Sequence, residues 1–378
     1  MTTEKLSVAI DASRNRSGGA KAHLIGILSA IDPRDHNIAE VHVWSYDNLL
    51  EQLPDTPWLI KHSPPELDRS IFSQLWWQRF RLPKQIVDAG CQILLSTDAG
   101  TVCRFEPSIV MSRDMLSFEE GEMQRFPFFS LSRLRLYLLK HMQIASLRSA
   151  SGALFLTRYA ANIIQKHTGH LKEVRVVPHG IAERFRQHLY KRELMPDRDV
   201  KCIYVSNVDF YKHQWNVVRA IWHLREKGHS IKLSLVGGGS GKAQKLLDDT
   251  INSLDPSGHF VEVLPSVPHS EIPDFLMSAD VFIFASSCEN MPNTLIEGMA
   301  SALPIACSNR GPMPEVLQDG GLYFDPEVPL SIAEAVETII LADEVRSSLV
   351  NKSVELSKSY SWERCARETW QYINDMSR

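Results

Sequence analysis

Two glutamates, Glu289 and Glu297, stand eight positions apart in the C-terminal half of the chain. An apolar run typical of a buried strand, residues 279–285, precedes Glu289, and a helix-like run, residues 294–300, carries Glu297. Pro292 suits the first helical position, because its missing N–H is no loss there. The segment predicts a strand, a loop carrying Glu289, and a helix start that attracts phosphate beside a carboxylate for sugar-like hydroxyls.

Two other loops that follow strand-like runs carry groups suited to a diphosphate. The loop at 206–214 contains Lys212, which either places a cation on a leaving group or is an ordinary surface lysine. The first loop, residues 14–19, holds Gly18 and Gly19 together with Arg14 and Arg16. Glycine lets backbone N–H groups approach an anion closely, so this loop is either a phosphate contact or a solvated Gly-rich turn.

Other motifs are weaker. The run Gly237–Ala243 resembles a phosphate-binding loop of ATPases, but Ala243 follows its lysine where Ser or Thr is needed, so we reject an ATPase. It is better interpreted as a strand-to-helix turn near a nucleotide. His167 and His170 have no companion ligand, and the six cysteines are scattered without a C-x-x-C pair, so the sequence predicts neither a metal site nor a disulfide framework.

Composition limits the classes of protein. The 378 residues suffice for two domains, and a net charge of −4 does not suggest a nucleic-acid binder. The sequence has no apolar run of about 18 residues, and its first residues lack a secretion signal, so we expect a cytoplasmic protein.

The elements that must position these loops alternate along the chain, strand-like runs with helix-like runs. This alternation predicts an α/β fold with parallel sheets covered by helices. Two such series, joined by a polar stretch at 184–199, predict two doubly wound Rossmann-like domains facing each other across a cleft. We place an N-terminal domain at 1–182 and a second domain at 183–361.

The segment 128–150 mixes leucines with Arg133, Arg135, Lys140 and Arg148. A basic amphipathic helix of this kind lies on an anionic membrane or forms a core helix with a solvated face. These residues leave both interpretations open.

With these pieces in view, the chain resembles the retaining GT-B glycosyltransferases of family 4, also called group 1. The resemblance is strongest over residues 174–362, through an ordered set of motifs rather than one signature. The set comprises Val176–Gly180, Tyr204–Lys212, Leu235–Gly239, Glu289 with Glu297, Pro304–Ile305, Pro314–Val316 and Gly320–Pro326. The fold that the resemblance implies is GT-B, with an acceptor-side domain at 1–182, a C-terminal helix at about 362–378 packing back onto it, and a nucleotide-sugar-binding domain at 183–361.

The resemblance implies transfer of a sugar from a nucleotide diphosphate donor, with retention and without a required cofactor or metal. Glu289 is expected at the donor sugar, Glu297 at the ribose, and Lys212 at the diphosphate. The expected catalytic residues are Glu289, Lys212 and Asp114. The expected donor-binding residues are Gly18, Gly19, Asn207, Lys212, Gly238, Val267, Glu289, Asn290, Met291, Asn293, Thr294 and Glu297.

The chain also departs from the family pattern. Asn207 stands where the family often has arginine, so Arg14 or Arg16 is expected to assist Lys212, and Arg113 or Asp114 replaces a histidine near the donor sugar. The departures resemble enzymes of bacterial surface polysaccharide and lipopolysaccharide synthesis, which suggests a GDP- or UDP-sugar, with mannosyl transfer from GDP-mannose as the specific expectation.

The expected acceptor is a saccharide or a lipid-linked saccharide at the inner face of the cytoplasmic membrane, with peripheral contact to anionic lipid and no nucleic-acid partner. The alternatives are a nucleotide-sugar epimerase of the same fold, which would change the donor without an acceptor, and a non-catalytic scaffold.

Overall fold

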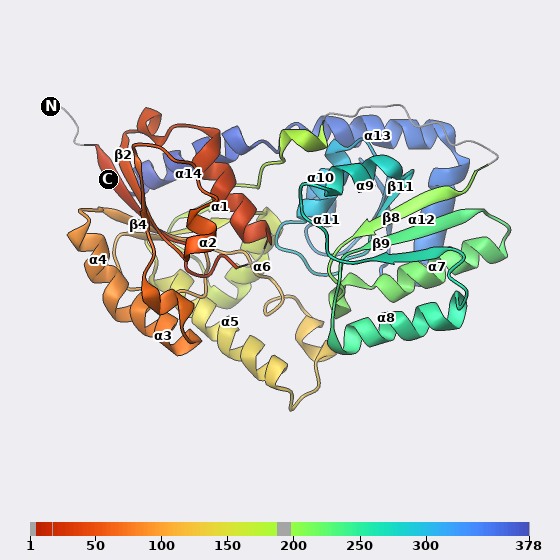
Figure 1. Cartoon of the computed structure of the whole chain (residues 1–378), viewed down its shortest axis with the longest axis horizontal. Helices are drawn as coiled ribbons and strands as arrows, with labels where there is room; N and C mark the ends of the chain where they lie inside the picture. The colour runs from red at the N-terminus through yellow and green to blue at the C-terminus, as the bar shows by residue number, and fades with distance from the viewer. Residues whose placement is uncertain (1–4, 17, 187–197, 378) are drawn as a thin grey trace. The chain divides into compact units, whose positions relative to one another are not determined.

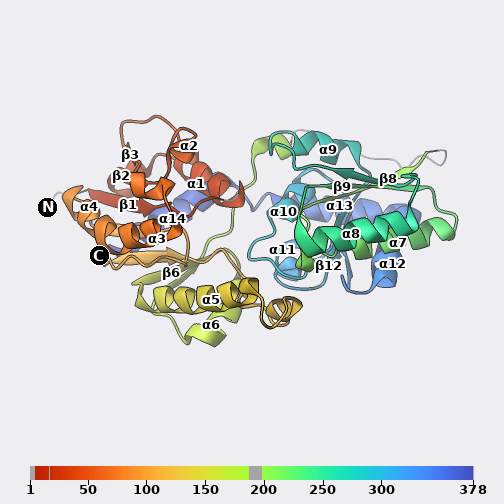
Figure 2. The ribbon, with the colours of Figure 1, turned by 60° about the horizontal axis from the view of Figure 1, so that its bottom comes forward.

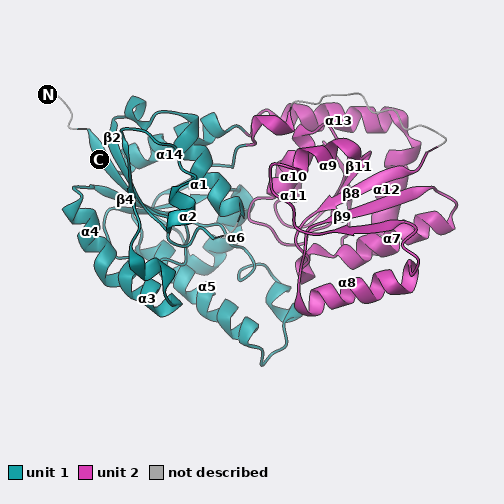
Figure 3. Cartoon of the chain, viewed as in Figure 1, with its two compact units in different colours: residues 1–180, 361–378 teal, residues 181–360 magenta. Residues whose placement is uncertain are grey.

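The computed structural model describes residues 5–16, 18–186 and 198–377. They divide into two compact units (Figures 1 and 3). Unit 1 comprises residues up to Gly180 and from Ser361 onward, and unit 2 comprises Ile181–Tyr360. The sequence analysis placed the boundaries at 182/183 and 361/362. Most of the polar stretch at 184–199, residues 187–197, lies outside the described residues.

Unit 1 contains a parallel sheet in the order β3-β2-β1-β4-β5-β6-β7. Its strands are β1 (Leu6–Asp11), β2 (Ile38–Trp44), β3 (Leu59–His62), β4 (Ile93–Ser96), β5 (Ser108–Met111), β6 (Gly152–Phe155) and β7 (Val174–Val176). Its helices are α1 (Gly18–Ala30), α2 (Asp47–Leu50), α3 (Ile71–Trp76), the π-helical turn η3 (Trp77–Arg81), α4 (Leu82–Asp88), α5 (Leu131–Ser149), α6 (Arg158–Thr168) and α14 (Trp362–Met376). Short 3-10 turns are η1 (Pro33–His36), η2 (Pro65–Asp68) and η4 (Glu122–Arg125).

Unit 2 contains a parallel sheet in the order β10-β9-β8-β11-β12-β13. Its strands are β8 (Val200–Val205), β9 (Ile231–Val236), β10 (Val261–Leu264), β11 (Val281–Phe284), β12 (Ile305–Ser308) and β13 (Leu322–Phe324). Its helices are α7 (Gln214–Glu226), α8 (Gly241–Leu254), α9 (Ile272–Ser278), α10 (Asn293–Ala300), α11 (Met313–Leu317), α12 (Pro329–Leu341) and α13 (Asp343–Ser357), with 3-10 turns η5 (Glu183–Phe185) and η6 (Phe210–Lys212).

The central strands are apolar because helices cover both faces of each sheet. Every residue of β4 and of β11 is buried, which is the pattern expected of parallel strands. In unit 1, α1 and α14 pack together on one face, and α3, α4, α5 and α6 cover the other (Figures 1 and 2). This arrangement follows from right-handed crossovers, since the chain moves across the sheet in opposite directions before and after β3. The predicted α/β class with two Rossmann-like sheets is confirmed.

The structure corrects two expectations about where helices begin. Helix α1 begins at Gly18, so Gly18 and Gly19 belong to its first turn rather than to the preceding loop. Pro292 is the N-cap of α10 and not its first helical residue: its ψ of 80° is not helical, while its carbonyl accepts from the N–H groups of Leu295 and Ile296.

Candidate functional site

Ten of the predicted site residues belong to unit 2, where they follow four neighbouring strands of its sheet. Asn207 and Lys212 follow β8, Gly238 follows β9, Val267 follows β10, and the remaining six follow β11 or lie on α10. These loops contact one another through the backbone. The N–H of Val208 donates to the carbonyl of Gly238 at 3.1 Å, and that of Ser287 donates to the carbonyl of Tyr211 at 2.8 Å. The fold thus gathers these loops at the edge where open α/β sheets bind ligands.

Lys212 and Glu289 form an ion pair at this edge. Their side chains are only 12% and 16% exposed, so the pair is shielded from most of the solvent. The hydroxyl of the fully buried Tyr204 donates to the carbonyl of Lys212 at 2.9 Å, which ties the lysine to β8. A diphosphate arriving here would compete with Glu289 for the ammonium group, and the released carboxylate would be available to hydroxyl donors.

Glu297 lies on α10 and is buried. Its Oε1 accepts from Nε2 of His269 at 2.6 Å, and Nδ1 of His269 lies 2.8 Å from a guanidinium nitrogen of Arg184. Because arginine has no acceptor, Nδ1 must carry the lone pair and Nε2 the proton. The other carboxylate oxygen, Oε2, is buried and has no hydrogen-bond partner within the described ranges. A buried acceptor of this kind is suited to a ligand hydroxyl.

The start of α10 carries four other predicted residues. Asn290 and Met291 are buried, whereas Asn293 and Thr294 in the first turn are partly exposed. The N–H of Asn293 donates to the carbonyl of Met291 at 3.0 Å, so this backbone donor at the start of α10 already has an internal acceptor. His213 is buried, with Nε2 2.9 Å from the hydroxyl of Ser287.

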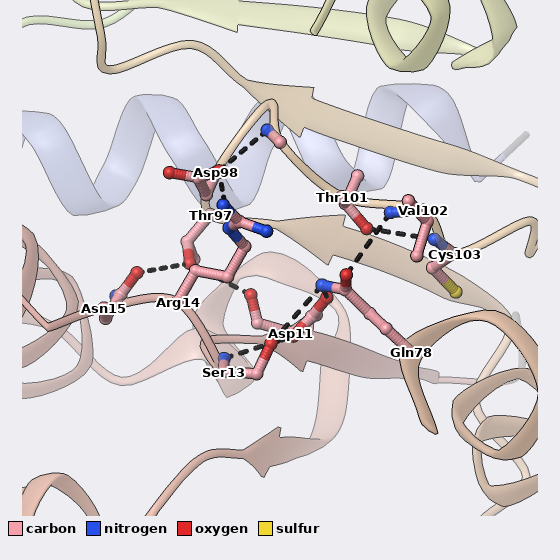
Figure 4. A network of polar contacts seen from close by, with 11 residues as sticks. Asp11, Ser13, Arg14, Asn15, Gln78, Thr97, Asp98, Thr101, Val102 and Cys103 are labelled. Atoms are coloured by element: carbon pink, nitrogen blue, oxygen red, sulfur yellow. Dashed lines mark hydrogen bonds and ion pairs between the residues drawn. The ribbon is translucent and has the colours of Figure 1, made fainter. Parts of the chain in front are cut away.

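The remaining predicted residues, Gly18, Gly19 and Asp114, belong to unit 1. The loop after β1 is held by a polar network (Figure 4). Asp11 accepts from the hydroxyl of Ser13 and from the amide of Gln78, both at 2.6 Å. Burial raises the pKa of Asp11, and these two hydrogen bonds oppose the rise. The network fixes the chain just ahead of α1.

Both arginines of that loop have partners inside unit 1. Arg14 forms an ion pair with Asp98 at 3.2 Å (Figure 4), and Arg16 donates to the carbonyl of Leu67 at 2.8 Å. The expectation, implied by the family resemblance, that Arg14 or Arg16 assists Lys212 stays a prediction.

The loop after β5 approaches the start of α1. A guanidinium nitrogen of Arg113 lies 3.3 Å from the carbonyl of Ala20, and desolvation lowers the pKa of Arg113 to about 10. Asp114 accepts from the N–H of Leu116 at 2.9 Å, while burial raises the pKa of its carboxyl. A carboxyl in such surroundings takes up a proton more readily than usual.

Two residues of the candidate site, Arg184 and His269, were not predicted from the sequence. They are 85 positions apart, and His269 is 28 positions from Glu297, which it contacts. The only available signal was the position of His269 in the loop after β10, two residues beyond Val267. In the part of the chain that the structure describes, no group of three or more His, Cys, Asp or Glu residues is placed to hold a metal ion.

The two Rossmann-like sheets and the site at the carboxyl edge of the second define a two-domain α/β protein of the GT-B type. Residues 186–355 match the family model "Glycosyl transferases group 1". The match supports assignment to the group 1 glycosyltransferase family through unit 2.

Individual relatives agree with this assignment. The chain is 28% identical over 110 residues to O-antigen chain mannosyltransferase B of Escherichia coli, covering 29% of each protein. It is 25% identical over 201 residues to D-inositol 3-phosphate glycosyltransferase of Corynebacterium glutamicum, covering 49% of this chain and 46% of that one. The matched segments therefore span less than half the length of these relatives.

Solved structures match nearly the whole chain. Sucrose-phosphate synthase from Thermosynechococcus elongatus superposes with a TM-score of 0.76 at 14% identity, covering 98% of this chain and 99% of that one. Anabaena HepE in complex with UDP-glucose gives a TM-score of 0.71 at 16% identity, covering 97% and 100%. At these identities the likeness establishes the fold.

Proposed function

We propose that the protein is a retaining glycosyltransferase that moves a sugar from a nucleotide diphosphate donor to an acceptor hydroxyl. The observation that carries the proposal is the shielded ion pair of Lys212 with Glu289 at the carboxyl edge of unit 2, on the two loops next to α10. The family match of residues 186–355 supports the same activity.

Each residue has a defined task in this proposal. Lys212 neutralises the charge that develops on the diphosphate as the bond to the sugar breaks. Glu289 accepts hydrogen bonds from the hydroxyls of the donor sugar. The free Oε2 of Glu297 accepts from the ribose. Asn207, Gly238, Val267, Asn290, Met291, Asn293 and Thr294 line the donor site, and unit 1 contributes Gly18, Gly19 and Asp114.

The reaction that we propose proceeds on one face of the sugar. The departing phosphate oxygen takes the proton of the acceptor hydroxyl, and the configuration at the anomeric carbon is retained. This route needs no metal, because Lys212 and the helix starts carry the opposing charge.

The donor that we propose is GDP-mannose, and the acceptor a saccharide or lipid-linked saccharide of surface polysaccharide synthesis. The similarity to an O-antigen mannosyltransferase favours mannose, and UDP-glucose, with which HepE was solved, is the alternative donor. We place the protein in the cytoplasm with peripheral contact to an anionic membrane.

A thermal-shift panel of GDP-, UDP-, ADP- and dTDP-sugars tests the donor, because a ligand that binds the folded state stabilises it by mass action. We expect GDP-mannose to raise the melting temperature most. Transfer to a saccharide acceptor then tests the activity, and the configuration of the product tests retention. Conversion of the sugar without any acceptor would instead indicate an epimerase, and binding without turnover would indicate a scaffold.

Two substitutions test the residues. Glu297→Ala should raise the donor KM about 10- to 100-fold, since hydrogen bonds to charged groups contribute roughly 1.5–3 kcal/mol. Lys212→Ala should lower kcat about 100-fold or more. Lys227→Ala is a matched control, because Lys227 also forms an ion pair, with Glu337 at 2.9 Å, at the opposite end of α7. If both site variants had the kinetics of the wild type, Glu297 and Lys212 would not have the proposed roles.

A further inference from the structure

Large apolar side chains of unit 1 are exposed in two segments, residues 71–87 and 128–138. Of the sixteen exposed large apolar residues in the described chain, eleven lie in these segments and the other five in unit 2. The eleven are Ile71, Phe72, Trp76, Phe80, Val87, Phe128, Phe129, Leu131, Leu134, Tyr137 and Leu138. Such clustering marks an interaction surface, because exposed apolar residues on a monomer are usually scattered.

The first segment is held firmly by its inner side. Trp77, Leu82 and Ile86 are fully buried in a core cluster that includes Trp44 and Leu94. The outer side of the same helical run presents Phe72, which is 80% exposed, together with Trp76 and Phe80. The guanidinium groups of Arg81 and Arg79 lie over the rings of Trp76 and Phe80, each at 5.5 Å.

The second segment is the start of α5 and the three residues that precede it. The buried residues of α5 are confined to its C-terminal half, Gln143, Ser146 and Leu147. Its first turns run out beyond the sheet of unit 1 (Figure 1). Phe129, 96% exposed, packs edge-to-face on Phe128, whose ring also lies 4.8 Å from the guanidinium of Arg133.

The charge of both segments has one sign. No Asp or Glu occurs from residue 69 to 87 or from residue 123 to 172, although the whole chain has 45 acidic and 41 basic residues. The charged residues of the segment 71–87 are Arg79, Arg81 and Lys84. Those of the segment 128–138 are Arg133 and Arg135.

Both segments belong to helices on the same side of the sheet. The crossovers that contain them, β3 to β4 and β5 to β6, run in the same direction across the strand order. Right-handed connections therefore place α3–α4 and α5 together, opposite α1 and α14, as Figures 1 and 2 show.

We propose that this face of unit 1, the 71–87 and 128–138 segments together, docks on the interfacial region of an anionic phospholipid bilayer. Aromatic and leucine side chains enter the headgroup boundary while the arginines and lysine meet lipid phosphates. Charge complementarity favours this occupant over a second copy of the chain, whose same face would bring like charges together. Two segments bury more apolar area in the interface than one, and the strength of binding rises with that area. The attachment is peripheral, since no helix of the described chain is long and apolar enough to cross a membrane.

Flotation of the full chain with vesicles tests the proposal without donor, acceptor or activity. We expect binding to phosphatidylcholine vesicles containing about 30% phosphatidylglycerol and little binding to phosphatidylcholine alone. Phe72→Ser/Trp76→Ser and Phe128→Ser/Phe129→Ser should each raise the lipid concentration for half-maximal binding about tenfold or more. Arg79→Glu/Arg81→Glu should do the same.

The matched control is Leu330→Ser/Leu341→Ser, which removes two exposed leucines from α12 of unit 2 and should leave vesicle binding unchanged. Because the substituted side chains are exposed, the melting temperature should stay close to that of the wild type. The proposal is overturned if the wild type does not bind anionic vesicles, or if the segment variants bind them as tightly as the wild type. A dimer in lipid-free solution that these variants dissociate would overturn it in favour of a second copy.

Discussion

At the scale of single residues, the sequence predicted candidate site groups but not the contacts between them. The eight-residue spacing singled out Glu289 and Glu297, and a lysine after a strand singled out Lys212. The ion pair of Lys212 with Glu289 spans 77 positions, and only the adjacency of β8 and β11 brings its partners together. Local spacing carries no information about such a pairing, so the sequence assigned the two residues separate tasks.

His269 gives a prediction at this scale. It orients Glu297 through its Nε2–H and is itself fixed by Arg184. His269→Ala should therefore weaken binding of the nucleoside diphosphate several-fold, less than Glu297→Ala does, with kcat nearly unchanged. Calorimetric titration measures the affinity and steady-state kinetics the rate. His269→Gln, which retains an N–H donor, should recover part of the loss. A fall in kcat at constant KM would contradict this positioning role.

At the scale of elements, long apolar runs were predictable and marginal ones were not. The apolar runs at 6–11, 93–96 and 231–236 predict three strands, and β1, β4 and β9 have these bounds. The structure also contains β3 and β13, which were not predicted. The four residues of β3 include Lys61 and His62, and β13 is only three residues long. Both lie at the edge of a sheet, where each pairs with one neighbouring strand. Their own residue patterns do not indicate a strand, so the pairing was not predictable from them.

The contact of α1 with α14 gives a prediction for an element. A Cβ added to Gly26 in α1 would lie 2.3 Å from the ring of Trp362, the first residue of α14. Gly26→Ala should therefore destabilise unit 1 by about 1–3 kcal/mol, because an overpacked core must shift its backbone or side chains.

Gly18→Ala is the control on the same helix. A Cβ there meets nothing within 4 Å, and Gly18 is the first residue of the helix, so the stability should change by less than about 0.5 kcal/mol. Denaturant unfolding measures both variants. Equal stability of Gly26→Ala and the wild type would show that Trp362 can move at little cost.

At the scale of the whole molecule, the two units were predictable because two series of alternating strands and helices are separate in the sequence. Unit 1 is nevertheless discontinuous, since residues 361–378 belong to it and not to unit 2, which precedes them. The family resemblance, rather than the pattern of residues, suggested this return of the chain. The structure supplies its cause: Cys365, Trp370 and Ile373 of α14 are fully buried.

The stability of unit 1 should depend on pH through His23. Burial, followed by the nearby His179 and Arg113, lowers the pKa of His23 well below its ordinary value of 6.5. As the pH falls, His23 therefore takes up a proton in the unfolded chain before it does so in the folded unit. Stability should fall as the pH decreases below about 6.5, by up to ~1.4 kcal/mol per pH unit for this one group. His23→Gln removes the titrating group, so its unfolding free energy should vary less steeply between pH 7 and pH 5. Parallel pH profiles of variant and wild type would contradict the assignment.

The discontinuity of unit 1 also predicts how the chain responds to truncation after Tyr360. Each large apolar side chain that is fully buried contributes roughly 1.5–3 kcal/mol, so losing Trp370, Tyr372 and Ile373 together costs about as much as the total stability of a domain. Unit 1 should unfold while unit 2, whose residues 181–360 remain intact, keeps its sheet. Hydrogen exchange should then show amides of β1, β4 and β6 losing protection and those of β8 and β11 retaining it. Removal of residues 377–378 alone should leave the protection of both sets of amides unchanged. If the longer truncation removed protection in both units, the two units would fold as one.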